Sequence, residues 1–408
     1  MGLVLVFLFL ASFASNYTVK AQTRTLIVPD QYQTIQDAIS NAMQGDTVFV
    51  KEGTYFTNNL MPIVINKPLS LIGENPRNTI IDGVNKSSIL LRNQFFWGGI
   101  EIFASAVTVS GFTIKNCDHA ISLDESSNGY RPISTVKILN NNIINNSEAI
   151  VHVSYSDSDF FISNNNITNN DSGIRLEVSD SIISENNFFG NKGTAISIYY
   201  NSSNVSITNN IIANNTDGIK LGNALLTNIY GNNVSYNEGF GTQFYGVNNA
   251  ILHGNNIIGN LIGIELANYD LGDLLPKVGS GNRVYYNNLV GNAKNALVQN
   301  SYPYNGSSIY GFRGNGTDVV SWDNGSVGNY WSDYKGNGTY VIDQNNIDYH
   351  PLTQPVDISI ATPTALNPFV LPVIVLVIAI SIAIIFAVRF RRHRKTANLV
   401  FRCFSANP

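Results

Sequence analysis

The residues best suited to bind or cleave an extended ligand are charged and aromatic side chains that each lie close to an apolar residue expected to point inward. Four isoleucines nearby should point into a core, namely Ile174, Ile196, Ile219 and Ile264. Side chains that follow an inward residue of a strand point outward. The candidate ligand-binding face therefore consists of Arg175, Glu177, Tyr199, Lys220 and Glu265, with Ser197 among them.

Two carboxylates on such a face could act as general acid and base, and a basic residue with an acidic helper could abstract a proton. Glycosidases place their carboxylates about 5 to 10 Å apart, and neighbouring strands lie about 4.8 Å apart. Residues one or two repeats apart therefore have a suitable separation. No two carboxylates take the same place in successive repeats, so the catalytic residues stay unknown. A solvated sheet face, polar at alternate positions, is the alternative.

The residue types give little support to metal binding or nucleic-acid binding. The chain has three methionines and five histidines without ligand spacing, namely His119, His152, His253, His350 and His393. Copper requires soft or imidazole ligands in a cluster, so we expect no metal site and no cofactor. His152 would fall in core register with Leu176, and we expect a local shift of register there. The formal net charge of −4 argues against nucleic acid as a partner.

The candidate residues belong to a sequence repeat. The apolar residues that follow each Asn pair are Ile143, Ile167, Phe188, Ile211, Val234, Ile257 and Leu289. Their period, near 23 residues with one longer unit, is typical of solenoids. Each unit has two short alternating segments and no apolar stripe at helical spacing. Leucine does not dominate as a leucine-rich repeat requires. The sequence therefore predicts an all-β parallel β-helix solenoid.

Asparagine suits the corners of such a solenoid. It tolerates the left-handed backbone conformation that sharp corners require. Its side-chain amide can also hydrogen-bond to the same amide in the coils above and below, as in cross-β stacks. We expect Asn209, Asn232 and Asn255 to form such a ladder.

The N-terminal part should cover the open end of the solenoid. The spacing of Ile35, Ala38, Ile39 and Ala42 predicts a short amphipathic helix. Thr34 is placed as its N-cap and Gly45 as its stop. A lid of this kind shields core groups and unpaired strand edges. We place this cap at residues 22–60, and the β-helix with its C-terminal cap at residues 61–355.

Two stretches carry a family resemblance. Residues 26–55, LIVPDQYQTIQDAISNAMQGDTVFVKEGTY, resemble the start of pectin-lyase-like right-handed parallel β-helix proteins, and the resemblance extends through residues 63–83. Residues 328–352, GNYWSDYKGNGTYVIDQNNIDYHPL, resemble the ending of archaeal surface proteins related to the NosD family. The resemblance implies right-handed winding and a place outside the cell. It also raises polysaccharide chemistry, because pectin-lyase-like folds often act on or hold sugars.

One departure from such relatives concerns calcium. Their WSDY motif is often followed by an Asp-rich insert, which here has shrunk to residues 335–340 without a run of carboxylates. A calcium loop needs oxygen ligands at alternating spacing, so we expect no calcium site there. We interpret Trp331 and Tyr334 as packing under the final coil. Their alternative role is a platform on which a sugar stacks.

Apolar runs near both ends predict export and anchoring. We place a signal peptide at residues 1–21. Residues 369–388 form a run of 20 residues without a charge, long enough to span a membrane. A stalk at 356–368 precedes this span, and the basic segment 389–408 follows it as a cytoplasmic tail. The expected location is therefore the cell membrane, with one span and with the repeats outside the cell.

Several Asn-X-Ser/Thr triplets agree with this topology. The candidate glycosylation sites in Gly-rich loops are Asn305, Asn315, Asn324 and Asn337. Our first functional hypothesis is a non-catalytic surface protein that binds polysaccharide or envelope glycan, or mediates cell-surface contact. A polysaccharide lyase or glycoside hydrolase and a structural envelope spacer are the alternatives.

Overall fold

The computed structural model describes eight stretches of the chain. They are residues 23–57, 62–83, 98–123, 132–153, 158–200, 202–267, 279–299 and 320–358. All of them belong to one compact unit, Met1–Ser359, and a second unit is formed by Ile360–Pro408.

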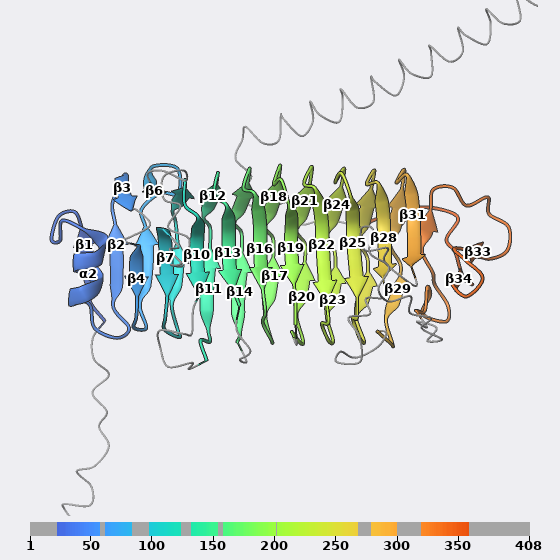
Figure 1. Cartoon of the computed structure of the whole chain (residues 1–408), viewed down its shortest axis with the longest axis horizontal. Coiled ribbons are helices and arrows are strands. Elements are labelled where there is room, and N and C mark those ends of the chain that lie inside the picture. The colour runs from blue at the N-terminus through green and yellow to red at the C-terminus, as the bar shows by residue number, and fades with distance from the viewer. Residues whose placement is uncertain are drawn as a thin grey trace, which may run out of the picture. The chain divides into compact units, whose positions relative to one another are not determined.

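The described strands form three long sheets, which the chain visits in the order A, B, C in each coil (Figure 1). Sheet A contains β1 (Thr25–Val28), β2 (Thr47–Val50), β5 (Ser70–Gly73), β8 (Thr108–Ser110), β11 (Val136–Leu139), β14 (Phe160–Ser163), β17 (Ile182–Ser184), β20 (Ser206–Thr208), β23 (Asn228–Tyr230), β26 (Ile251–His253) and β29 (Arg283–Tyr285). Sheet B contains β3 (Gly53–Thr57), β6 (Thr79–Gly83), β9 (Thr113–Lys115), β12 (Asn142–Ile144), β15 (Asn166–Thr168), β18 (Asn187–Phe189), β21 (Ile211–Ala213), β24 (Asn233–Ser235), β27 (Asn256–Ile258), β30 (Asn288–Val290) and β32 (Tyr330–Trp331). Sheet C contains β4 (Ile63–Ile65), β7 (Gly98–Ile102), β10 (His119–Leu123), β13 (Glu148–His152), β16 (Ser172–Leu176), β19 (Thr194–Ile198), β22 (Asp217–Gly222), β25 (Phe240–Tyr245), β28 (Ile262–Ala267) and β31 (Lys294–Gln299).

Neighbouring strands within each sheet are parallel, so the expected parallel β-helix is confirmed. The core is the bore of this helix, lined by inward side chains from all three sheets. In one coil these are Ile207, Ile212, Ile219 and Leu221, all essentially inaccessible to solvent. Full burial of one such side chain contributes roughly 1.5 to 3 kcal/mol, and each coil repeats that contribution.

Two ladders of buried asparagine run through the corners of the β-helix. At the corner between sheets A and B, each Nδ2 donates to Oδ1 of the next asparagine in the series Asn141, Asn165, Asn186, Asn210, Asn232, Asn255, Asn287 and Asn329. The corner between sheets B and C carries the second series, Asn146, Asn170, Asn191, Asn215, Asn237, Asn260 and Asn292. The expected ladder therefore exists, and Asn232 and Asn255 belong to it.

The ladder position of Asn209 was predicted wrongly by one residue. Asn209 takes the left-handed corner conformation with φ of 56°, and Asn210 turns inward. The same division of roles occurs at Asn164 (φ of 58°) and Asn165. The inward residue of β21 is likewise Ile212 and not Ile211, because Ile212 pairs with Phe188 and Val234.

His152 corrects a second expectation. It pairs with Leu176 and is fully buried, so the expected shift of register is wrong. Its Nδ1 lies 3.2 Å from the carbonyl oxygen of Leu123, and its ring contacts Phe160 edge-on with centroids 4.9 Å apart. These contacts give the polar ring a place among apolar neighbours.

The expected lid is present at the N-terminal end. Helix α2 (Ile35–Asn41) buries Ile35, Ala38 and Ile39, and the hydroxyl of Thr34 accepts a hydrogen bond from the Asp37 amide as its N-cap. The helix ends earlier than predicted, with Ala42 as its C-cap instead of Gly45.

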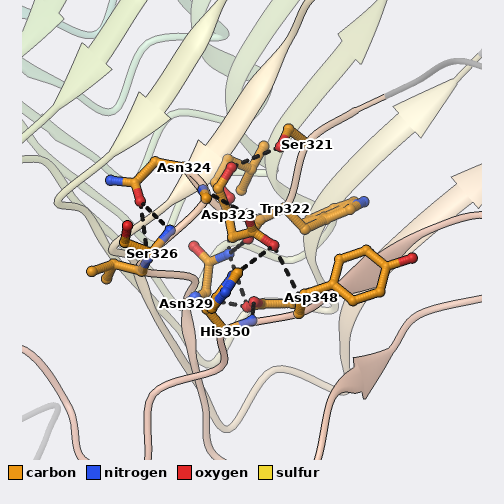
Figure 2. A network of polar contacts seen from close by, with 12 residues as sticks. Ser321, Trp322, Asp323, Asn324, Ser326, Asn329, Asp348 and His350 are labelled. Atoms are coloured by element: carbon orange, nitrogen blue, oxygen red, sulfur yellow. Dashed lines mark hydrogen bonds and ion pairs between the residues drawn. The ribbon is translucent and has the colours of Figure 1, made fainter.

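The C-terminal cap covers the other end with aromatic rings and buried polar groups (Figure 2). Trp331 is almost fully buried and stacks on Tyr340 with centroids 4.1 Å apart. Its indole nitrogen and the Asn329 amide both donate to Oδ2 of Asp348, at 2.8 and 2.7 Å. Asp348 thus ends the first ladder. β33 (Tyr340–Val341) and β34 (Ile347–Asp348) form a small antiparallel pair here.

Two groups of side chains in the cap make further contacts. Trp331 is buried and Tyr334 is half-buried against Tyr340, which confirms the packing interpretation of both. His350 lies 3.4 Å from Asp323, whose oxygens also accept from the backbone amides of Gly325 and Tyr349 (Figure 2).

The expected signal peptide and membrane span, residues 1–21 and 369–388, lie outside the described residues. Within the described stretches no helix has the length and apolar character to cross a membrane.

Replacement of a ladder asparagine should destabilise the fold strongly. Asn210 accepts from the backbone and side-chain amides of Asn186, and its own Nδ2 donates to Ile183 O and to Asn232. Asn210→Ala leaves several buried groups unpaired, so we expect a loss of about 3 kcal/mol in urea unfolding. The matched control Asn209→Gly keeps the left-handed corner and should change stability by less than about 1 kcal/mol. Equal effects of the two substitutions would contradict the assigned roles.

Candidate functional site

The candidate residues lie on the outer face of sheet C. Pairing between strands places Arg175, Ser197, Lys220, Gln243 and Glu265 in one column, one residue from each of five successive coils. Glu177 and Tyr199 follow the inward residues Leu176 and Ile198, so they lie beside that column. We call this surface the sheet C face. The placement derived from the sequence is thus correct, while a binding role for these residues stays a prediction.

An ion-pair chain lies towards the N-terminal side of the face. Arg175 donates two hydrogen bonds to Glu148, from Nη2 to Oε2 at 2.8 Å and from Nε to Oε1 at 3.3 Å. Glu148 Oε2 also lies 3.7 Å from Nε2 of His119. Burial lowers the pKa of His119 and Arg175 lowers it further, whereas Glu148 and Asp118 raise it.

Sequence reasoning missed His119 and Glu148. Both begin a strand of sheet C, and they pair directly with each other. Their spacing of 29 residues departs from the usual period because the coil between them carries a longer connection. A search for polar residues at the first strand position would have found them.

An aromatic platform lies near the middle of the face. Tyr245 belongs to the coil after Gly222 and pairs with it. A Cβ at Gly222 would lie only 2.1 Å from the Tyr245 ring, so the ring rests directly on the glycine. This lets Tyr245 approach Tyr199, with ring centroids 6.2 Å apart. Lys220 Nζ lies 5.6 Å from the centre of the Tyr245 ring, within cation–π distance.

The C-terminal side of the face holds a buried polar pair. Gln243 Nε2 donates to Glu265 Oε2, and both side chains are nearly inaccessible although they point away from the core. Glu265 Oε1 and Gln243 Oε1 find no donor among the described residues. Burial raises the pKa of Glu265, while the Gln243 hydrogen bond and Lys220 lower it. Burial likewise raises the pKa of Glu177, and Arg175 lowers it.

The geometry limits what these carboxyl groups can do together. Glu177 and Glu265 are four coils apart, which is about 19 Å at the strand spacing. A glycosidase pair needs about 5 to 10 Å. These two residues therefore do not form a hydrolytic pair. The platform and its polar neighbours are instead suited to hold a ligand along the helix axis.

The glycosylation candidates divide into two groups. Asn324 and Asn337 are exposed on the C-terminal cap, and Asn305 and Asn315 lie outside the described residues. Oδ1 of Asn324 accepts from the amides of Ser326 and Val327. Occupancy of these sites stays a prediction.

Stacked parallel sheets with an asparagine-lined corner and a helical lid define a pectin-lyase-like parallel β-helix protein. A family model described as "Periplasmic copper-binding protein (NosD)" matches residues 39–200 and 134–336. These matches cover more than half of the chain, which therefore belongs to the NosD family. The description agrees with repeats outside the cytoplasm. No relative among the curated proteins matches the sequence.

Solved structures share the fold at low sequence identity. Pectate lyase Pel9A aligns with a TM-score of 0.52 and 13% identity over 69% of this chain and 79% of that chain. This likeness is consistent with the expected right-handed winding. The A-module of mannuronan C-5 epimerase AlgE6 from Azotobacter vinelandii aligns with a TM-score of 0.42 and 15% identity, over 66% of this chain and 91% of that chain.

The family description names copper, which requires soft or imidazole ligands in a cluster. Among the described residues no three His, Cys, Asp or Glu side chains gather as metal ligands. The described histidines are separate: His119 lies beside Glu148, His152 in the core, His253 between the rings of Tyr230 and Tyr285, and His350 beside Asp323. Burial raises the pKa of Cys117 to about 12, which disfavours the thiolate that binds metals. These residues do not fit a bound copper ion.

The glycine under the platform provides a direct test of its geometry. Gly222→Ala should displace the Tyr245 ring and destabilise the protein by about 1 to 3 kcal/mol, since the new methyl group has no room. In a Tyr245→Ala background the same substitution should be nearly neutral. Urea unfolding of the four proteins gives the coupling energy, and additive effects would show that the ring does not rest on the glycine.

Glu265 should make stability depend on pH. Its folded pKa lies above its unfolded value, so the folded state holds the proton more tightly. This contribution is fully present below the unfolded pKa and is lost as the pH rises through the folded pKa. Relative to Glu265→Gln, the wild-type protein should therefore lose unfolding free energy as the pH rises from about 4, near the unfolded pKa, through the folded pKa. A wild-type protein that gains stability over this range relative to the variant would contradict the assignment.

Proposed function

We propose that this protein is a membrane-anchored β-helix protein outside the cytoplasm that binds carbohydrate along the sheet C face without cleaving it. The observation that carries the proposal is the Tyr245 ring on Gly222, beside Tyr199 and Lys220. Aromatic rings offer apolar faces to the C–H groups of a sugar, and neighbouring polar groups orient its hydroxyls.

The surroundings of the platform support a binding role. Tyr199, Lys220 and Tyr245 are half-buried, and Tyr200 beside them is 49% exposed. Tyr200 extends the aromatic surface, since its ring lies 6.2 Å from that of Tyr199. Because coils repeat at about 4.8 Å, a polymer along the axis would pass the half-buried side chains of Arg175, Tyr199, Lys220 and Tyr245, which belong to four successive coils.

Two further elements of the proposal rest on the sequence and on the strand pairing. Anchoring rests on the uncharged run at 369–388 with its basic segment at 389–408. A non-catalytic role is supported by the separation of Glu177 from Glu265, which is too large for a hydrolytic pair.

Binding to a glycan array, with parallel assays for reducing ends and unsaturated products, tests the proposal. We expect binding without turnover, and Tyr245→Ala should raise Kd about tenfold through loss of the stacked ring. The matched control is Tyr349→Ala, which removes a tyrosine that is 62% exposed on the C-terminal cap. Turnover by the wild-type protein would establish a lyase or hydrolase instead, and silence in all three assays would favour an envelope spacer.

A further inference from the structure

The charge on the sheet C face bears on the class of its ligand. Its acidic side chains are Glu101, Glu148, Glu177, Asp217 and Glu265, and its basic side chains are Arg175, Lys220 and Lys294. Five carboxyl groups thus face three cations among the described residues. Protonation of Glu177 and Glu265 would remove two negative charges and still leave no excess of positive charge.

The two cations nearest the platform already have partners. Arg175 binds Glu148 in a bidentate ion pair, in which Nε donates to Oε1 and Nη2 donates to Oε2. Lys220 lies against the Tyr245 ring and within electrostatic reach of Glu265. A carboxylate on a ligand would have to share Arg175 with Glu148, and Lys220 with the Tyr245 ring and Glu265.

The hydrogen-bonding groups around the platform are short of donors. Oε2 of Glu177, Oε1 of Gln243 and Oε1 of Glu265 are buried acceptors that lack a donor among the described residues. Glu177 adjoins Tyr199 on one side of the platform, and Gln243 comes two residues before Tyr245 on the other. These oxygens are inaccessible, so they act on a ligand only through their negative charge, which disfavours a carboxylate on the surface above them and leaves a neutral hydroxyl-rich ligand unaffected.

We infer that the sheet C face recognises a neutral, hydroxyl-rich polysaccharide and discriminates against polyuronates. This inference rests on the proposed carbohydrate binding and names its ligand class. Stacking on Tyr199 and Tyr245 supplies affinity, and the carboxyl groups supply discrimination by repelling an anionic chain. Because the attraction is not between opposite net charges, binding of the neutral polymer changes little with salt.

The test measures Kd by titration calorimetry for a β-glucan and a mannan, as neutral polymers, and for polygalacturonate and alginate. The full-length protein is used at low and at high salt. We expect a neutral polymer to bind at least about tenfold more tightly than either polyuronate at low salt. Its Kd should be nearly independent of salt, and Tyr245→Ala should weaken its binding.

A charge variant makes the test specific. Glu177→Lys should tighten polyuronate binding at low salt, with a steep loss at high salt, and Glu177→Gln should do so only slightly. Circular dichroism confirms that both variants are folded. Tighter binding of a polyuronate than of every neutral polymer by the wild-type protein would overturn the inference and leave the proposed function intact. Failure of all four polymers to bind would overturn the proposed function itself.

Discussion

The hydrogen bond between buried asparagine amides of successive coils is the constraint on which the rest of this structure depends. Each Oδ1 accepts from both the backbone and the side-chain amide of the preceding asparagine, as Asn210 does from Asn186. A buried amide left without partners costs free energy. A coil that slipped by one residue would break the five hydrogen bonds that Asn210 makes to the neighbouring coils. The ladders therefore hold the coils in vertical register and make every outward column straight.

Straight columns explain how a functional surface arises on so regular a scaffold. Residues about two dozen positions apart become direct neighbours, and a single small residue changes what its neighbour in the next coil can do. Gly222 is the example, because the absence of a side chain there leaves room for the Tyr245 ring to pack on it, close to Tyr199. The lid at α2 and the cap around Asp348 close the two ends of the stack.

Membership of the NosD family accounts for the architecture of this chain, and the surface residues bear on its ligand. The family description names copper, yet the described histidines lie at separate places and Cys117 is buried in the core. The polar groups that do gather lie on the sheet C face, where carboxyl groups outnumber cations. That balance favours contact with hydroxyl groups.

The sequence by itself determined the solenoid, the lid and the shared face of Arg175, Ser197, Lys220 and Glu265, because isoleucines in phase over many units permit one register. It missed Gln243 in the same column, because the inward residue before it is Thr242 and not isoleucine. The sequence could not show which of the adjacent residues Asn209 and Asn210 joins the ladder. In the structure Asn209 takes the left-handed corner conformation, and Asn210 points inward. Tertiary structure alone brought His119 to Glu148 and Arg175, because a longer connection broke the period between them. It also decided that Tyr245 leans over Gly222, since such an approach depends on the room between two coils and not on the periodicity of either.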